Sequence, residues 1–568
     1  MSFTSEAVKS EKLGALGLIA ATIHKLGLID KLDSRLDFSE AKGGIVSHGR
    51  RAAAMILNGL GFMNSRLYMT PHFFEDKPVQ ELLGGAITST HLNDDCLGRC
   101  LDKIADYGTT KLYSELAFEV AQEQDVLSNL MHLDTTNFVL YGRYDGESGD
   151  GPTPAHGYSK ANRPDLKQVV LSLTQGGAAN LPLWMEALDG NSSDKANFQS
   201  TVRRVQAFTK GLESAPDSLC FVGDAALYTP EKLAELDAVF WITRVPSQHK
   251  AARQLLQMTN EQLGWKTIDE NYRFVVVGTT QHGIQQRWIL VASRHAESRE
   301  LKTFQRRLDK KSDALQKELW HLSNQKFSCE HDAKKAIKPL LKKLKYHRVD
   351  YEIIPIKRYS QKGRPKPETE KAVVGYQIQA NLSSCLQSIQ HARGTLGRFI
   401  LATNQLDEET LNSPEILSQY KGQSSVESGF KFIKNNAFEL SSFYLKTPRR
   451  IAALLMIMTL CLMVYNFAQY SMRKCINESD DVLPNQNGRP VKNPTLKWIA
   501  ELMDMIAVVT IEHGGQSHRI ITNVKKVHQR IITYFGPKAL EIYGLPPNLK
   551  NVVIDHTKFK NITHWYRE

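Results

Sequence analysis

Hydrophobic residues recur at helical spacing through the first quarter of the chain. Residues 1–32 read as one amphipathic helix, and further helices are expected over residues 49–60, 78–83, 93–107 and 109–124. Asn93 is a suitable N-cap because its side chain can accept a hydrogen bond from the first helical turn. The pattern therefore predicts a helical N-terminal domain over residues 1–128.

From residue 129 the pattern changes to apolar runs of strand length. Residues 131–142 form one such run, and residues 168–188 form two runs around a glycine-rich turn, which predicts a hairpin. The elements that follow are a helix at 197–212, a strand at 218–224, a helix at 231–236 and a strand at 238–245. Strand, hairpin, helix, strand, helix, strand is the order of an α/β RNase H-like core. Residues 129–245 are predicted to be its first part.

The core is then interrupted by a segment of different character. Residues 301–345 are long, basic and helical, and strands are expected at 272–277, 287–293, 351–356 and 375–380. We interpret residues 246–395 as an inserted mixed α+β domain. A strand at 397–403 opens the second part of the core, residues 396–471. In the C-terminal region, residues 472–568, a basic helix is expected over 517–534; this region would serve dimerisation or DNA contact.

Length and charge limit the classes of protein. A chain of 568 residues is too long for one ordinary core, so two to four domains are expected. The net charge is +12, and residues 301–370 hold 19 Lys/Arg against 9 Asp/Glu. This excess favours a polyanionic partner. The short N-terminal helices are accordingly expected to bind DNA or to dimerise, with a helical domain that only packs on the core as the alternative.

One apolar stretch raises the question of a membrane-spanning helix. Residues 451–465 contain no charge, but this run is shorter than the roughly 20 residues that a spanning helix needs. A buried core helix is expected, and no membrane association. The seven cysteines are scattered, with one pair, Cys96 and Cys100, four residues apart. Reduced thiols and the lack of an opening signal peptide predict a cytoplasmic protein.

Four polar residues fall on one helical stripe in YKGQSSVESGFKFIK. With Tyr420 at zero and about 100° per residue, Gln423 lies near −60°, Glu427 near −20° and Lys434 near −40°. The apolar residues Val426, Phe430, Ile433 and Ala437 lie on an adjacent stripe. This pattern is typical of a helix at the edge of an active site, and a solvated amphipathic helix is the alternative.

Two aspartates occupy unusual places in apolar strands. Asp134 follows Leu133 inside LDTTN, and Asp224 ends SLCFVGD. Burying a carboxylate is costly unless it is paired or bound to a metal. Hard divalent cations prefer carboxylate oxygens. Asp134, Asp224 and Glu427 are therefore candidate metal ligands; a strand-end cap is the alternative for each aspartate alone.

The segments LDTTNF at Asp134 and GDAALYT at Asp224, together with the stripe at Glu427, resemble a known family. They are similar to bacterial insertion-sequence transposases of the insertion-sequence-four superfamily, DDE enzymes with a Tyr-x2-Arg-x3-Glu-x6-Lys arrangement on an RNase H-like core. The resemblance covers about residues 5–470. Gln423 stands where the family has Arg, and Gln lacks the charged bidentate hydrogen bonding of a guanidinium.

The resemblance implies a function and its cofactors. Asp134, Asp224 and Glu427 would be catalytic and would hold two Mg²⁺ ions, or Mn²⁺. The enzyme would cut double-stranded DNA at terminal inverted repeats, pass through a hairpin on the transposon end and join the element to target DNA. A homodimer in the synaptic complex and a bacterial, nucleoid-associated location are expected. The alternative is a catalytically inactive or co-opted DNA-binding derivative, and a nuclease without transposition is a third reading.

Other residues are candidates for DNA contact. Tyr420 and Lys434 would contact phosphates near the cleaved end, and Lys431 would compensate for Gln423. Lys160, Arg163 and Lys167 lie on the loop YSKANRPDLKQ, where phosphate contact competes with a solvated loop. Of the aromatic residues near the insertion we expect each to be core, with base stacking as the alternative: Trp241, Trp265, Trp288 and Trp320.

Overall fold

The computed structural model consists of two compact units. It describes residues 8–38, 44–61, 69–142, 144, 151–159, 162–192, 194–212, 218–234, 236, 239–359, 370–434, 447–513 and 515–547. The first unit comprises Met1–Trp241 and Ser418–Glu568, and the second comprises Ile242–Leu417. Because the chain leaves the first unit and returns to it, the second unit is an insertion in sequence terms. Its limits are wider than the predicted 246–395.

The first unit contains a mixed sheet. Strands β4 (Leu181–Leu188), β3 (Gln168–Gly176), β2 (Leu130–Val139) and β5 (Cys220–Gly223) lie side by side in this order. The β2–β3 and β3–β4 pairs are antiparallel, whereas β2 and β5 are parallel. β2, β3 and β5 are largely buried along their length, as apolar runs covered on both faces should be.

The elements along this part follow the predicted order. Helix α8 (Asp194–Thr209) joins β4 to β5, helix α9 (Pro230–Ala234) follows β5, and strand β6 (Phe240–Arg244) comes next. The Phe240 amide donates to the Leu219 carbonyl at 3.1 Å, which places the start of β6 beside the start of β5. The predicted sequence of strand, hairpin, helix, strand, helix and strand is thus confirmed, within a mixed α/β fold.

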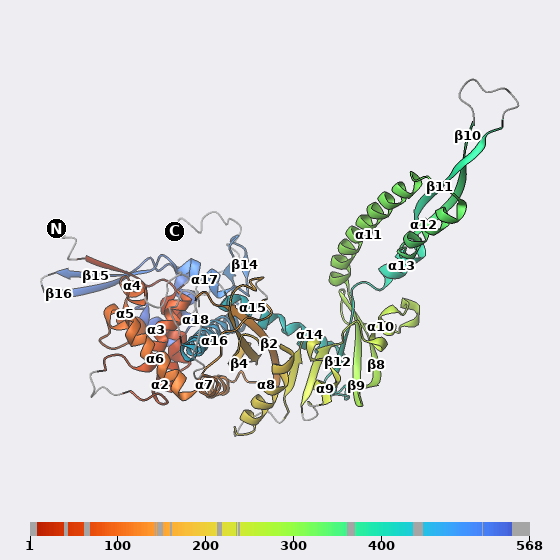
Figure 1. Cartoon of the computed structure of the whole chain (residues 1–568). Coiled ribbons are helices and arrows are strands. Elements are labelled where there is room, and N and C mark those ends of the chain that lie inside the picture. Colours follow the sequence, from red (N-terminus) through yellow and green to blue (C-terminus); the bar gives the residue numbers. More distant parts are fainter. Residues whose placement is uncertain are drawn as a thin grey trace. The chain divides into compact units, whose positions relative to one another are not determined.

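Helix α16 (Pro448–Glu478) forms the core of the first unit. It packs against α1 (Leu16–Lys25), α3 (His48–Leu60), α6 (Asp94–Tyr107), α7 (Thr109–Glu123) and β4 (Figure 1). By length and composition alone it is apolar enough to cross a membrane, but 89% of its most apolar window is buried within the protein. Residues 451–465 therefore lie in a buried core helix, as predicted.

A bidentate ion pair fixes the start of α16 on α6. The Arg450 guanidinium donates to both carboxylate oxygens of Asp102, at 2.8 and 2.6 Å. These hydrogen bonds lower the pKa of Asp102. Gly98 lies directly beneath, where a Cβ would come within 3.3 Å of the guanidinium, so a small residue allows this approach.

The N-terminal prediction of one helix over residues 1–32 is wrong. Val8–Lys12 form strand β1, followed by α1 and by α2 (Leu28–Asp33). Gly14 and Gly27 have φ angles of 49° and 62°, and such left-handed backbone interrupts a helix. The shorter helices α4 (Thr70–Phe74) and α5 (Val79–Leu83) complete this region with α3, α6 and α7, and Asn93 caps α6 as predicted.

The prediction of a helix over residues 517–534 is wrong in its first half. Strands β15 (Ala507–His513) and β16 (Gln516–Thr522) form a hairpin, and only Lys526–Tyr534 is helical, as α18. The β-branched run Ile520–Thr522 suits a strand, and Asn523 has a φ of 65°, which ends it. β1 pairs with the other edge of β15, so both ends of the chain contribute to one sheet.

Short strands β13 (Leu483–Pro484) and β14 (Pro490–Val491) and helices α17 (Leu496–Met503) and α19 (Pro537–Ile542) complete the C-terminal region.

The second unit has its own sheets. The end of β6 pairs with β12 (Arg398–Thr403), which is followed in order by β9 (Ile284–Ser293), β8 (Tyr272–Gln281) and β7 (Lys266–Thr267), all antiparallel. Two long strands, β10 (His347–Arg358) and β11 (Ala372–Ser384), form a separate hairpin. Helices α11 (Arg294–Ser323) and α12 (Glu330–Lys342) pack on it through Leu315, Leu319, Ile337 and Leu340. Helices α10 (Lys250–Gln257) and α13 (Leu386–Gly394) complete this unit, and α14 (Ser413–Gly422) leads the chain back into the first unit.

Candidate functional site

The two aspartates occupy equivalent positions on neighbouring parallel strands. In the β2–β5 pairing, Leu130 lies opposite Cys220 and His132 opposite Val222. Continuing this register by two residues brings Asp134 opposite Asp224, which directly follows β5. Since paired strands lie about 4.8 Å apart, the two backbones are close at this point. Asp134 is half-buried and Asp224 is exposed, so their carboxylates are at the border between core and solvent.

The segment from α14 to α15 (Ser424–Ile433) runs along the face of β2 that carries Asp134. His132, Asp134 and Phe138 share this face because side chains alternate along a strand. A Cβ at Gly422 would come within 3.0 Å of the His132 ring. Twelve residues later, the Lys434 ammonium lies 5.7 Å from the centre of the Phe138 ring. The helical segment therefore starts beside His132 and ends beside Phe138.

Further contacts place the stretch that carries Glu427. A Cβ at Gly429 would come within 2.6 Å of the Gln175 side-chain nitrogen, and Gln175 lies opposite His132 in the β2–β3 pairing. Glu427 therefore lies between two glycines, Gly422 and Gly429, that pack closely on side chains of β2 and β3. The Glu427 side chain is exposed.

The prediction of one continuous helix through Tyr420 and Lys434 is wrong in detail. Tyr420 belongs to α14, Glu427 to α15, and Gln423 is the residue between the two helices. The Gln423 amide bonds to the Tyr420 carbonyl and the Val426 amide to the Gln423 carbonyl, both three residues back. Such tighter turns advance by about 120° per residue, so Tyr420 does not keep its predicted angle to Glu427. Glu427 and Lys434 keep theirs.

One buried residue of this face was not among the predicted site residues. His132 is 4% exposed, and burial lowers its pKa to about 4, so the imidazole is neutral at physiological pH. Its ring packs on Gly422, which allows α14 to approach β2 closely. In the sequence HLDTT, a histidine two residues before an aspartate on the same strand could have drawn attention to this position. The sequence alone does not indicate that the ring packs against Gly422.

The donor types fit a divalent cation, although the carboxylates are not gathered around one point. One oxygen of Asp134 accepts from the Thr135 amide at 2.8 Å, and one oxygen of Asp224 from the Ala226 amide at 2.8 Å. These bonds orient both carboxylates. Within the described ranges no group of three His, Cys, Asp or Glu side chains is close enough to hold a metal ion. Carboxylates are nonetheless the ligands that Mg²⁺ takes, with water filling its other positions.

The structure places the predicted DNA-contacting residues unequally. Lys434 lies over Phe138, on the face of Asp134, and Lys431 is exposed on α15. Arg163 is exposed but forms an ion pair with Asp165 at 2.7 Å, which raises the Arg163 pKa. Lys167 donates to the Tyr144 carbonyl at 2.8 Å. Lys160 lies outside the described residues.

The four tryptophans differ in exposure. Trp241 and Trp288 are buried, as expected of core residues, and Trp265 is half-buried beside the guanidinium groups of Arg273 and Arg398. Trp320 is 63% exposed on α11, so the expectation of a core position is wrong for this residue. Buried rings cannot stack on a base, which removes Trp241 and Trp288 as candidates.

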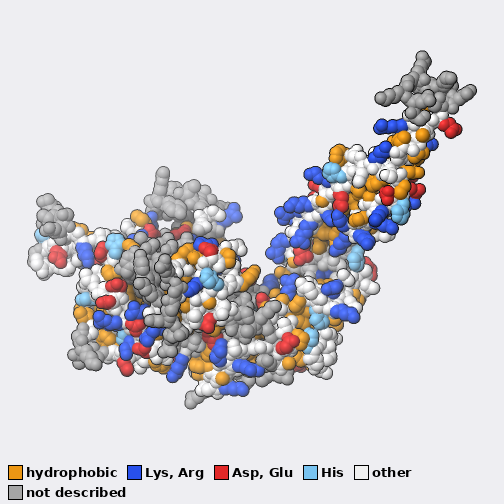
Figure 2. All heavy atoms as spheres, in the orientation of Figure 1, with side chains coloured by type: hydrophobic (Ala, Val, Ile, Leu, Met, Phe, Trp, Pro, Cys, Tyr) orange, Lys and Arg blue, Asp and Glu red, His pale blue; other side chains and the backbone are white. Residues whose placement is uncertain are grey.

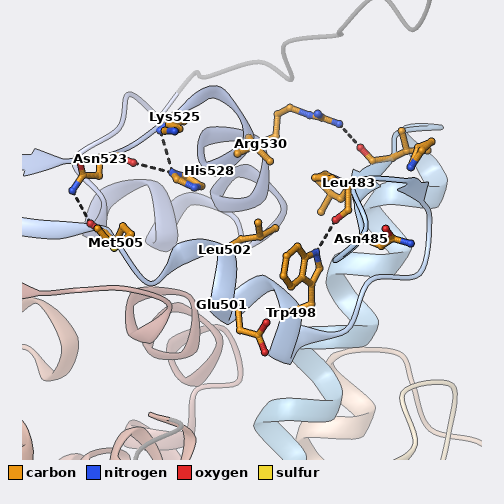
Figure 3. Close-up of a pocket in the computed structure, with 15 residues that line it drawn as sticks. Leu483, Asn485, Trp498, Glu501, Leu502, Met505, Asn523, Lys525, His528 and Arg530 are labelled. Atoms are coloured by element: carbon orange, nitrogen blue, oxygen red, sulfur yellow. Dashed lines mark hydrogen bonds between the residues drawn. The ribbon is translucent and has the colours of Figure 1, made fainter. Parts of the chain in front are cut away.

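The C-terminal region holds a cavity of about 510 Å³ that is separate from these residues (Figure 3). The Trp498 indole donates to the Pro484 carbonyl at 2.7 Å, and the Asn523 amide donates to the Met505 carbonyl at 2.8 Å. His528 bonds to the backbone of Asn523 and Lys525. The polar groups of Trp498, Asn523 and His528 are thus engaged in hydrogen bonds that hold α17, α18 and β13 together. None of the predicted site residues lines it.

The mixed sheet, with Asp134 on β2 and Asp224 directly after β5, defines an α/β protein with carboxylates on neighbouring strands. A family model described as a transposase DDE domain matches residues 133–464, a range that contains Asp134, Asp224 and Glu427. This is more than half of the chain, and the chain belongs to that family. The protein is a DDE transposase, an enzyme that moves segments of DNA, and transposases of this kind typically use divalent metal ions.

Further comparisons describe the remainder of the chain. Residues 8–118 match a domain of unknown function, DUF4277. A cryo-EM structure of a piggyBac transposase synaptic complex with hairpin DNA is similar at 9% sequence identity and a TM-score of 0.36, covering 86% of this chain and 79% of that one. The comparison with curated proteins found no match.

Proposed function

We propose that this enzyme performs cut-and-paste transposition of an insertion sequence, with Asp134, Asp224 and Glu427 as its catalytic carboxylates. The observation that carries the proposal is the placement of Asp134 within β2 and of Asp224 directly after the parallel neighbouring strand β5, with Glu427 on a helix that packs on β2. Acids on rigid elements suit a site that must hold its geometry through successive reactions.

The residues would have distinct roles in the reaction. Two divalent ions, Mg²⁺ or Mn²⁺, when bound would activate the attacking oxygen and stabilise the leaving oxygen. Asp134 and Asp224 are oriented by their backbone hydrogen bonds, and Glu427 approaches from the helix. Lys434, on the same face, would attract a DNA phosphate by its point charge. Tyr420, Gln423 and Lys431, with the loop residues Lys160, Arg163 and Lys167, would hold the flanking backbone.

Four successive displacements at phosphorus complete the proposed cycle. Water attacks the phosphodiester at the element end, the bond to the 3′ oxygen breaks, and a 3′-OH and a 5′-phosphate result. The 3′-OH then attacks the opposite strand, displaces the 3′ oxygen of the flanking DNA and closes a hairpin on the transposon end. Water opens the hairpin and regenerates the 3′-OH, which attacks a phosphorus of the target strand and displaces the target's own 3′ oxygen.

Several finer assignments belong to this proposal. The resemblance supports an RNase H-like core at residues 129–245 and 396–471 and membership of the insertion-sequence-four superfamily. Residues 1–128 would bind terminal inverted repeats or dimerise, residues 246–395 would be an inserted domain, and residues 472–568 would add dimer or DNA contacts. The active form would be a homodimer on double-stranded DNA, associated with the bacterial nucleoid in the cytoplasm.

A DNA-binding derivative without activity is the second candidate, and Gln423 is the residue that favours it. A neutral amide binds phosphate more weakly than the Arg of the family pattern. The two candidates predict opposite results for cleavage by the purified chain.

Cleavage of a linear duplex that carries the element's own ends tests the proposal. With Mg²⁺ we expect strand breaks at the ends and, after addition of plasmid, strand-transfer products; with EDTA we expect neither. Binding without Mg²⁺-dependent breaks would favour the inactive derivative. Breaks without transfer products would indicate a nuclease.

A further inference from the structure

A row of cations follows one side of α11. With Arg306 at zero and about 100° per residue, Lys302 lies near −40°, Arg299 and Lys317 near +20°, and Lys310 near +40°. The buried Leu315 and Leu319 lie near 180° and 220°, on the opposite side, where α11 packs on the hairpin unit. The five basic residues, here called the α11 stripe, are all exposed.

The residues of the stripe form no ion pairs within the described part of the chain. Some cations elsewhere in the second unit are paired, as Lys343 is with Glu318 at 2.7 Å and Arg348 with Asp350 at 2.9 Å. Two exposed acids lie close by: Asp313 near −20°, within the stripe, and Asp309 near −60°, at its border. Figure 2 shows Lys and Arg side chains gathered over α11.

The dimensions of the stripe match a phosphate backbone. Arg299 to Lys317 spans about 27 Å of helix. Phosphates of one DNA strand recur about every 3.4 Å along the axis, so about eight lie beside such a length. No apolar side chain projects within the stripe between its two ends, whereas protein interfaces have an apolar centre. Charge without apolar area is what phosphate contact requires.

We propose that the α11 stripe binds the backbone of duplex DNA independently of base sequence. This inference rests on the proposed function, since it gives the inserted unit a DNA-holding role in addition to the chemistry proposed for the first unit. Lys and Arg on a helix side contact phosphates and read no base edges. The stripe would therefore add affinity without adding selectivity for the element ends.

The same helix offers a matched control. Arg307 and Lys311 are also four residues apart and exposed, but they lie near +100° and +140°, on the flank of the stripe. The charge of Lys311 contributes to lowering the pKa of His347 on β10, after the effect of burial, which places Lys311 toward the hairpin. The pairs R306Q/K310Q and R307Q/K311Q remove the same charge and introduce the same residue, which is a good helix former.

The test is the salt dependence of binding to a duplex of unrelated sequence, measured by fluorescence anisotropy with the full chain in EDTA. Each lost phosphate contact should reduce the magnitude of the slope of log binding constant against log salt concentration by about 0.9. R306Q/K310Q should lower it by about 1.8, and R307Q/K311Q by less than half as much. D313N should tighten binding, a gain that misfolding cannot produce.

Three results would overturn the inference: equal effects of the two pairs, an unchanged slope in R306Q/K310Q, or no tightening in D313N. The first two would indicate diffuse charge or an acidic protein partner. Failure of the proposed function looks different. In that case the unaltered chain would not cut its own ends with Mg²⁺, while the stripe variants would still change the salt slope.

Discussion

Replacement of Asp134 by Asn is expected to abolish DNA cleavage and to leave DNA binding intact. Loss of one metal-binding carboxylate removes several kcal/mol of transition-state stabilisation, and about 4 kcal/mol corresponds to about 10³-fold in rate. The amide has the same shape, and its oxygen can still accept from the Thr135 amide. Single-turnover cleavage of an end-bearing duplex should therefore fall at least about 10³-fold. Asp224→Asn should behave alike, because the two residues share one register.

Asp189→Asn is the matched control for both changes. Asp189 directly follows β4, as Asp224 follows β5, but β3 separates it from β2. Its oxygen accepts from the Thr153 amide at 2.7 Å, which an Asn oxygen can also do. This variant should cleave within about twofold of the unaltered enzyme. Normal cleavage by Asp134→Asn, or an equal loss in Asp189→Asn, would remove the assignment of Asp134.

Replacement of Glu427 by Gln is the second change with a large expected effect. Glu427 is exposed, so the side chain gives little to folding and its loss should affect chemistry alone. We expect a fall in cleavage of about 10³-fold, with the thermal midpoint of unfolding unchanged within about 1 °C. Cleavage kinetics and a thermal melt of the same preparation measure both.

Glu512→Gln is the control for this change. Glu512 is also exposed and lies on β15, in the β1–β15–β16 sheet and not in the sheet that carries Asp134. It should keep full cleavage activity. If Glu427→Gln retained cleavage, or if both Glu variants lost it equally, the third carboxylate would have to be sought on another element.

The strands and the helix that carry the three candidate acids could be predicted from the sequence because each follows a local rule. An aspartate within or directly after an apolar strand is costly and therefore conspicuous, and the periodicity around Val426 and Phe430 defines a helix. These rules do not give the pairing of strands. That β2 and β5 run parallel side by side depends on contacts between segments about 90 positions apart in the chain, which no local pattern encodes.

The errors share the same cause. Residues 516–522 became a strand because β15 was available to pair with them, and β1 formed for the same reason. Tertiary pairing overrides a local helical preference. The break at Gln423 follows the approach of Gly422 to His132, a contact between segments about 290 residues apart. Trp320 was expected in the core by residue type, but it lies on the side of α11 opposite the packed leucines.

Binding of Mn²⁺ followed by electron paramagnetic resonance tests most directly whether the three carboxylates form one metal site. We expect that the full chain binds Mn²⁺ and that Asp134→Asn, Asp224→Asn and Glu427→Gln each weaken this binding at least about tenfold, since ligand carboxylates carry much of the affinity. Asp189→Asn should bind as the unaltered chain does. Unchanged Mn²⁺ affinity in all three carboxylate variants would contradict a metal site formed by these residues.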